Sequence, residues 1–183
     1  MMTPRLKDKY QKDVVPAMMK KFEYKNVMQV PKLEKIVLNM GLGRAVAEPK
    51  IVDLASEEMG KLTGQKPVLT KSKKAISNFR LRRVFHPVWL VWLGKNHVCD
   101  SYARLCNVAL PRVRDFRGVS TKAFDKTGNY TLGLREHTIF PEIEMDKAEG
   151  AAIGMNITFV TTAGTKEEGM ELLSLMGMPF RKK

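Results

Sequence analysis

The sequence contains few cysteines and no long apolar segment. Two cysteines among 183 residues are too few for a disulfide framework, which favours a reducing compartment. No stretch approaches the ~18 consecutive apolar residues of a membrane-spanning helix. The first residues, MMTPRLKDKYQKD, are charged where a secretory signal would be apolar, so we expect no export. Apolar residues make up 44% of the chain, which is enough for a buried core, and the length of 183 residues predicts a single domain over residues 1–183. With few cysteines and a charged first segment, we expect a cytoplasmic protein.

Acidic residues are missing from a long part of the chain. From Met59 to Cys99 there is no aspartate or glutamate, whereas lysine and arginine recur throughout. Over the whole chain, 32 Lys and Arg stand against 19 Asp and Glu, which gives a net charge of +13. A compact domain with this balance repels itself unless it meets a polyanion. The charge therefore predicts nucleic acid or an acidic membrane as the partner, without distinguishing the two.

Basic and acidic residues are concentrated in separate segments of the chain. Residues 71–83, KSKKAISNFRLRR, show no clean helical or strand period, and we expect them to form a long, exposed, basic loop. A later stretch is acidic, and we expect it to form a surface patch. Its members are Glu136, Glu142, Glu144, Asp146 and Glu149.

Hydrophobic periodicity predicts four helices. Apolar residues at four-residue spacing predict a helix over 6–18, which Pro16 would kink or split. Other stripes predict helices over 98–109 and from Thr165, where Thr-Lys-Glu-Glu forms a capping box. Another helix is predicted between Pro49 and Gly64. Its apolar side would hold Ile51, Leu54, Met59 and Leu62.

Side chains that alternate between two faces predict strands over 35–40, 129–134 and 155–161, an apolar run predicts one over 88–93, and a short strand is expected over 67–70. Strands with one apolar face, mixed with helices, predict an α+β domain: an antiparallel sheet with helices packed on one face and the other face open. Short neutral hydrogen-bonding groups occupy the expected open face. Such a surface suits the sugar hydroxyls and base edges of RNA, although an ordinary strand face accounts for it equally well. The residues are Asn39, Asn129, Thr131, Asn156 and Thr158.

Motifs for catalysis, nucleotide binding and metal binding are incomplete. A glycine pair after the first predicted strand lacks the third glycine of a dinucleotide-binding fingerprint. His97, Cys99 and Cys106 lack a fourth ligand at metal spacing, and both cysteines fall on the predicted core side of their helix. His137 has no serine or cysteine partner that spacing suggests. We therefore expect no enzyme, no cofactor and no metal site.

Several segments nevertheless resemble one family closely. The most specific is Ala109–Gly118, ALPRVRDFRG. The others are found at 30–43, 63–67, 73–79, 128–130, 139–143 and 177–182. In this order and spacing the chain resembles the bacterial-type ribosomal proteins number five of the large subunit, and the resemblance covers essentially the whole chain.

The resemblance implies a fold and a set of partners. The family has an antiparallel sheet with helices on one face. It binds 5S rRNA and helps attach it to the large-subunit rRNA in the central protuberance. Its basic loop reaches the peptidyl-site tRNA, and its acidic side touches a basic small-subunit protein, number thirteen.

Particular residues match positions with these roles. Asn39, Gln65 and Phe79 match family positions at the 5S rRNA surface. The stretch from Glu136 to Glu149 falls where the family approaches the small subunit. The tRNA-facing loop would contain Lys73, Lys74, Ser77, Asn78, Arg80 and Arg82.

Residues 83–101 depart from the family pattern. Where the family has a polar turn, a Val-Thr-Leu strand and a Met-Tyr-Glu-Phe helix start, this chain reads RVFHPVWLVWLGKNHVCDS. Both flanks match in register, as two compensating reading-frame shifts would leave them, and genuine divergence is the alternative. The departure puts Trp92 where the family has a small polar residue on the RNA face.

Two other functions remain as alternatives. A protein that binds duplex DNA would need base-reading or wedge residues in an element that enters a groove, and the basic segment here is predicted to be a loop. A peripheral membrane protein would need aromatic residues on an amphipathic basic helix, whereas Trp89 and Trp92 fall in a predicted strand. Competition among 5S rRNA, duplex DNA and anionic vesicles distinguishes the three.

Overall fold

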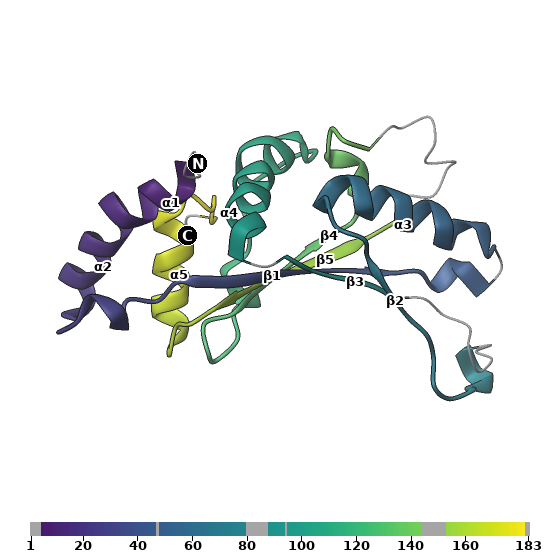
Figure 1. Ribbon diagram of the computed structural model, residues 1–183, viewed down its shortest axis with the longest axis horizontal. Helices are drawn as coiled ribbons and strands as arrows, with labels where there is room; N and C mark the ends of the chain where they lie inside the picture. The colour runs from purple at the N-terminus through teal and green to yellow at the C-terminus, as the bar shows by residue number, and fades with distance from the viewer. Residues whose placement is uncertain (1–4, 47, 80–87, 94, 144–152, 182–183) are drawn as a thin grey trace. The chain divides into compact units, whose positions relative to one another are not determined.

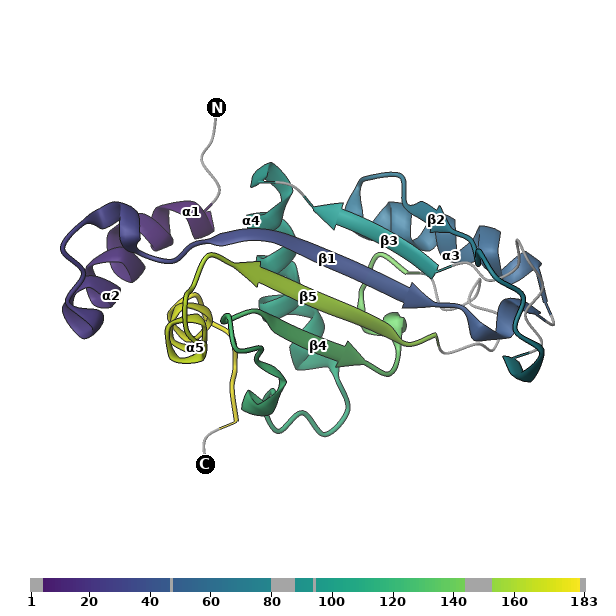
Figure 2. The same cartoon turned by 90° about the horizontal axis from the view of Figure 1, so that it is seen from below.

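The computed structural model describes residues 5–46, 48–79, 88–93, 95–143 and 153–181. In these parts of the chain, five strands form one sheet in the order β2-β3-β1-β5-β4. Figure 2 shows neighbouring strands running in opposite directions, and β2 pairs antiparallel with β3, with Leu69 opposite Trp89. The predicted α+β class and antiparallel sheet are confirmed. The strands are β1 (Leu33–Gly41), β2 (Val68–Thr70), β3 (Val88–Leu93), β4 (Tyr130–Leu134) and β5 (Met155–Thr161).

The N-terminal helix changes its winding just before Pro16, the residue at which the sequence predicts a kink or a split. α1 (Arg5–Lys9) is followed by a wide π-helical turn (Tyr10–Val14) and then by α2 (Val15–Phe22). Pro16 lies in the first turn of α2, where its missing N–H leaves no ordinary helical bond to the preceding turn. The helical path widens there, so that the Val15 N–H donates to the Tyr10 carbonyl oxygen.

The helix before the most specific sequence motif also changes its winding. α4 (Lys95–Arg104) continues as a π turn (Leu105–Ala109) and a short 3-10 turn (Leu110–Arg112) that contains Pro111. The predicted apolar stripe is buried, with Tyr102 fully so. The predicted core side of the cysteines is confirmed for Cys106, whose sulfur lies 3.8 Å from that of the buried Met178, although Cys99 and Cys106 are each only half-buried. Burial still raises the pKa of the Cys106 thiol to about 11.

The chain divides into two compact units, which we describe separately. The first unit contains residues 1–36, 94–132 and 158–183, and the second contains 37–93 and 133–157. In the first unit α4 lies behind the strands in Figure 2. Its core is aromatic: the Tyr102 and Phe159 rings meet edge-on at 5.6 Å, and Tyr130 packs edge-on against Phe180 at 5.6 Å.

The second unit has one long helix, α3 (Lys50–Thr63), which packs along β3 (Figure 1). Pro49 precedes its first turn, and Gly64 ends it in the left-handed region with φ 68°, as the sequence predicts. One predicted core residue is wrong: Leu54 is 39% exposed. Ala55 is buried instead, because the buried stripe rises four residues at a time from Ile51 through Ala55 to Met59.

The C-terminal helix α5 (Lys166–Leu175) begins with the predicted capping box between Thr165 and Glu168. Glu168 also accepts a 2.6 Å hydrogen bond from the Tyr24 hydroxyl, and Lys21 pairs with Glu171 at 2.6 Å. Burial alone would raise the pKa of the Glu168 carboxyl. The hydrogen bonds from Tyr24 and from the backbone of Gly164 and Thr165 outweigh that effect, so its pKa lies below the ordinary value.

Candidate nucleic-acid interface

Two threonines of the first unit face one another across neighbouring strands of the sheet. The hydroxyl oxygens of Thr131 in β4 and Thr158 in β5 lie 3.2 Å apart, so one hydroxyl donates to the other. On β5 the neighbours of Thr158, Ile157 and Phe159, point the opposite way and are buried. Thr131 is exposed and Thr158 half-buried. The alternation therefore turns both threonines away from the core, as the sequence predicts, and the hydrogen bond between them fixes the spacing of the two hydroxyls.

Asn129 lies at the start of β4 and forms hydrogen bonds within the protein. Its side-chain oxygen accepts from the Thr161 backbone N–H at 3.1 Å, and its amide nitrogen donates to the Thr127 hydroxyl at 3.0 Å. The Thr127 hydroxyl in turn donates to Asp125 at 3.1 Å. Asn129 therefore fixes the loop before β4 against β5, and its side chain is engaged within the protein at both its oxygen and its nitrogen.

In the second unit two asparagines lie on the polar side of their strands. Asn39 is half-buried between the buried residues Leu38 and Met40 of β1, and Asn156 on β5 is exposed. Gly133 lies beside Asn156: a β-carbon at this glycine would be 3.4 Å from the Asn156 side-chain oxygen. The glycine therefore leaves the Asn156 amide uncovered on that side.

Gln65 follows the end of α3, where its backbone is held in place. The Thr63 hydroxyl donates to the Met59 carbonyl at 2.7 Å and accepts from the Gln65 N–H at 3.2 Å. Gly64 turns the chain in the left-handed region, and the Gln65 side chain is half-exposed. The backbone held in this way carries an amide that the family resemblance assigns to the 5S rRNA surface.

The described part of the basic segment is irregular and exposed. Lys73, Lys74, Ser77 and Asn78 are all exposed, and a short 3-10 turn covers Ser77–Phe79. The Ser72 hydroxyl donates to the Lys74 carbonyl at 2.6 Å, and this bond bends the chain at Lys73. The Phe79 side chain, Arg80 and Arg82 lie outside what the structure describes.

The acidic stretch is described only in part. Glu136 is exposed and Glu142 half-exposed, whereas Glu144, Asp146 and Glu149 lie outside the described residues. Glu136 precedes the short 3-10 turn His137–Ile139 of the second unit.

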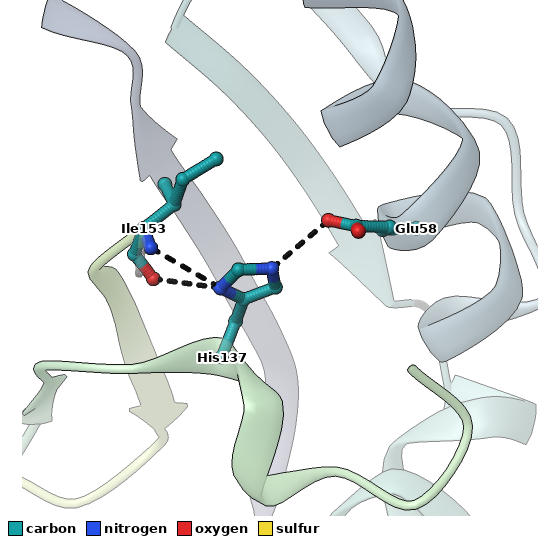
Figure 3. A network of polar contacts seen from close by, with 3 residues as sticks. All are labelled: Glu58, His137 and Ile153. Atoms are coloured by element: carbon teal, nitrogen blue, oxygen red, sulfur yellow. Dashed lines mark hydrogen bonds and ion pairs between the residues drawn. The ribbon is translucent and has the colours of Figure 1, made fainter. Parts of the chain in front are cut away.

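His137 makes a contact that sequence reasoning missed (Figure 3). It is 1% exposed, and its Nε2 lies 2.9 Å from the Glu58 Oε2 of α3. Its Nδ1 lies 3.0 Å from the Ile153 carbonyl oxygen and 3.3 Å from the Ile153 nitrogen. With Nε2 protonated, the ring donates to Glu58 and accepts from the Ile153 N–H; when it is doubly protonated, Nδ1 donates to the Ile153 carbonyl. The only sequence signal was that Glu58 is the last carboxylate before the acid-free window.

Among the described residues, no cluster of three His, Cys, Asp or Glu side chains is close enough to hold a metal ion. Within the same parts of the chain, no helix has the length and apolarity to cross a membrane. Hydroxyls, amides and lysines are the groups that line the candidate surfaces. They can hydrogen-bond to sugars, bases and phosphates.

Comparison with known proteins gives consistent matches along the chain. Residues 26–82 match the family described as ribosomal protein L5, and residues 89–180 match the model for the C-terminus of the same ribosomal family. The chain is 57% identical over 179 residues to the large ribosomal subunit protein uL5 of Carboxydothermus hydrogenoformans, covering 98% of this chain and 99% of that one. It is 56% identical over 182 residues to the uL5 protein of Clostridium kluyveri, covering all of both chains. The uL5 protein of Clostridium acetobutylicum is 54% identical over 179 residues, 98% of this chain and 99% of that one.

Proposed function

The chain belongs to the ribosomal protein L5 family, and on that basis we propose that it binds 5S rRNA through the polar side of its sheet. It is a structural, non-enzymatic constituent of the large ribosomal subunit of the bacterial cytoplasm. The finer proposal is that it attaches 5S rRNA to the large-subunit rRNA in the central protuberance.

The Thr131–Thr158 pair is the observation that carries this proposal. Neutral hydroxyls at a fixed spacing on a strand face can donate to and accept from ribose hydroxyls and base edges. A solvated strand face usually contains lysines and glutamates. Lysines would bind phosphate, and glutamates would repel it. Asn39 and Asn156 in the second unit, and Gln65 after α3, add amides of the same chemical kind.

A second contact is proposed for the basic loop. Lys73 and Lys74 are exposed, and no carboxylate occurs in the sequence between Met59 and Cys99. Such a loop attracts a phosphate backbone without reading its sequence, which suits the peptidyl-site tRNA. The acidic stretch that begins at Glu136 suits the opposite kind of partner, the basic small-subunit protein number thirteen.

Binding measured against competitors tests the central proposal. Labelled 5S rRNA should bind the purified protein in the presence of excess duplex DNA at the same salt concentration, and anionic vesicles should not displace it. The protein should also co-sediment with large subunits. Displacement of 5S rRNA by duplex DNA at equal salt would make the protein a general nucleic-acid binder, and displacement by vesicles would make it a membrane binder; either outcome rejects the proposal.

A further inference from the structure

Two apolar side chains, Val27 and Met28, are exposed in the segment that connects α2 to β1 in the first unit; Figure 2 shows the path of this segment. A 3-10 turn over Val27–Gln29 connects these elements. Met28 is 83% exposed and Val27 55% exposed. These two adjacent side chains leave apolar surface in water, and a partner that covers it gains free energy.

The turn is rigidly built despite its exposure. The Asn26 side-chain oxygen accepts from the Met28 N–H at 2.9 Å, and the Asn26 carbonyl accepts from the Gln29 N–H at 3.0 Å. The turn then enters the core at Val30, which is 5% exposed. The Tyr10 hydroxyl donates to the Pro31 carbonyl at 3.0 Å and holds this exit against the N-terminal helix. Met28 is therefore held outward by a turn that loses little entropy on binding.

The surroundings of the turn favour RNA as its partner. From Arg5 to Lys32 the sequence has eight lysines and arginines but three carboxylates. Lys25, Asn26, Gln29 and Lys32 are all exposed next to the apolar pair. The lysines can bind RNA phosphates, and the amides can hydrogen-bond to sugars and bases. The two apolar side chains between them can pack against a ribose or a base.

The turn is also continuous with the proposed RNA-binding strands of the same unit. The Lys32 N–H donates to the Thr162 hydroxyl at 3.0 Å, and the Thr162 N–H donates to the Lys32 carbonyl at 3.0 Å. These bonds fix the exit of the turn beside the end of β5, the strand that carries Thr158. An RNA that lies along the Thr131–Thr158 pair has a direct path to the turn.

Resting on the proposed function, we propose that the Val27–Gln29 turn is an additional 5S rRNA contact, in which Met28 and Val27 pack against a ribose or base while neighbouring lysines meet phosphates. The flexible, polarizable thioether of methionine packs well on an aromatic base. The contact adds affinity without adding a charge.

The test compares the 5S rRNA affinity of the unmodified protein with the affinities of three variants. Val27→Ser combined with Met28→Ser should weaken binding about tenfold and leave the slope of log affinity against log salt unchanged. Val108→Ser changes another exposed apolar residue, 39% exposed on the π turn after α4, and should leave affinity unchanged. Asn26→Ala keeps both apolar side chains but removes the bond that fixes Met28, and should weaken binding by a smaller factor.

The outcomes separate this proposal from the proposed function. If the unmodified protein binds 5S rRNA and the Val27→Ser/Met28→Ser variant binds within about twofold of it, this contact does not exist and the proposed function stands. If the unmodified protein does not bind 5S rRNA, the proposed function fails first. The serine variants should melt at the temperature of the unmodified protein because their altered side chains are exposed, whereas Asn26→Ala loses a capping hydrogen bond and should melt slightly earlier. If the Val27→Ser/Met28→Ser variant melts early, it is replaced by Met28→Gln alone, for which the same loss of affinity is expected and unchanged affinity overturns the proposal.

Discussion

Gly169 of α5 lies directly against the backbone of Gly128, in the loop before β4. A β-carbon on Gly169 would collide with the Gly128 carbonyl oxygen, and a β-carbon on Gly128 would lie 2.7 Å from the Thr165 carbonyl oxygen. Gly128 also has a φ of +79°, a conformation that other residues rarely adopt. This close approach of two glycines fixes the first turn of α5 beside Asn129, whose side chain ties the loop to β5.

Gly169→Ala should therefore destabilise the protein by about 1–3 kcal/mol, even though alanine favours a helix more than glycine does. Gly60→Ala in α3 is the matched control. The nearest atom to its added β-carbon lies 4.0 Å away, so it should stabilise by about 0.5–1 kcal/mol. Urea unfolding measures both. Equal effects of the two substitutions would show that the Gly128–Gly169 contact does not constrain the fold.

Glu168→Gln should make the stability of the protein less dependent on pH in the acidic range. The folded-state pKa of Glu168 is lowered, so its ionised form stabilises the fold above its ordinary pKa of 4.5. That contribution is lost as the pH falls through the lower folded-state pKa. The difference in melting temperature between the unmodified protein and Glu168→Gln should be largest near pH 7 and should shrink below about pH 4. A difference that stays constant with pH would contradict the account of Glu168.

His137→Leu should cost more stability than His137→Gln. Leucine leaves the Glu58 carboxylate, whose side chain is 13% exposed, without its donor, and we expect a loss of about 2–4 kcal/mol. Glutamine can still donate a hydrogen bond toward Glu58, so its cost should be smaller. Denaturant unfolding measures both values, and equal losses would mean that the ring contributes by its volume and not by its hydrogen bonds.

Trp92→Thr tests whether residues 83–101 result from shifted reading frames. The resemblance puts Trp92 where the family has a small polar residue on the RNA face, and the neighbouring Val91 on β3 is buried. If the segment is a frame-shift product, Trp92→Thr should improve solubility or 5S rRNA affinity. Loss of affinity in this variant would instead mean that Trp92 stacks on a base and that the segment diverged functionally, since such stacking is worth about 1–3 kcal/mol.

Local patterns predict the elements of this fold well, and contacts between distant segments are where they fail. Alternation predicts which side of β1 and β5 is buried, and Thr165 with Glu168 predicts the start of α5, because each signal lies within a few residues. The prediction for Leu54 is wrong because both i+3 and i+4 spacing from Ile51 lie near the same helix face. The core side contains Ala55 at i+4, and Leu54 at i+3 is exposed. Periodicity says nothing about the partner of His137, which is 79 residues away in the sequence.

The candidate site is predictable in kind but not in detail. Strand alternation correctly predicts that Thr131 and Thr158 lie on the polar side of their strands, but not that their hydroxyls meet. It does not predict that Asn129 uses its side-chain oxygen inside the protein, because that bond depends on the Thr161 backbone of another strand. The exposed turn at Val27–Gln29 escapes periodicity altogether, since apolar residues are ordinarily assigned to the core.

The most direct test of the account is the 5S rRNA affinity of the Thr131→Val/Thr158→Val variant. Both changes keep the side-chain shape and remove the facing hydroxyls. Ser174→Ala, which removes an exposed hydroxyl from α5, is the control. The account predicts that the double variant loses about 1–3 kcal/mol of binding free energy with an unchanged salt slope, because no charge is lost, and that the control binds normally. Normal 5S rRNA affinity in the double variant would contradict the claim that this face of the sheet binds RNA.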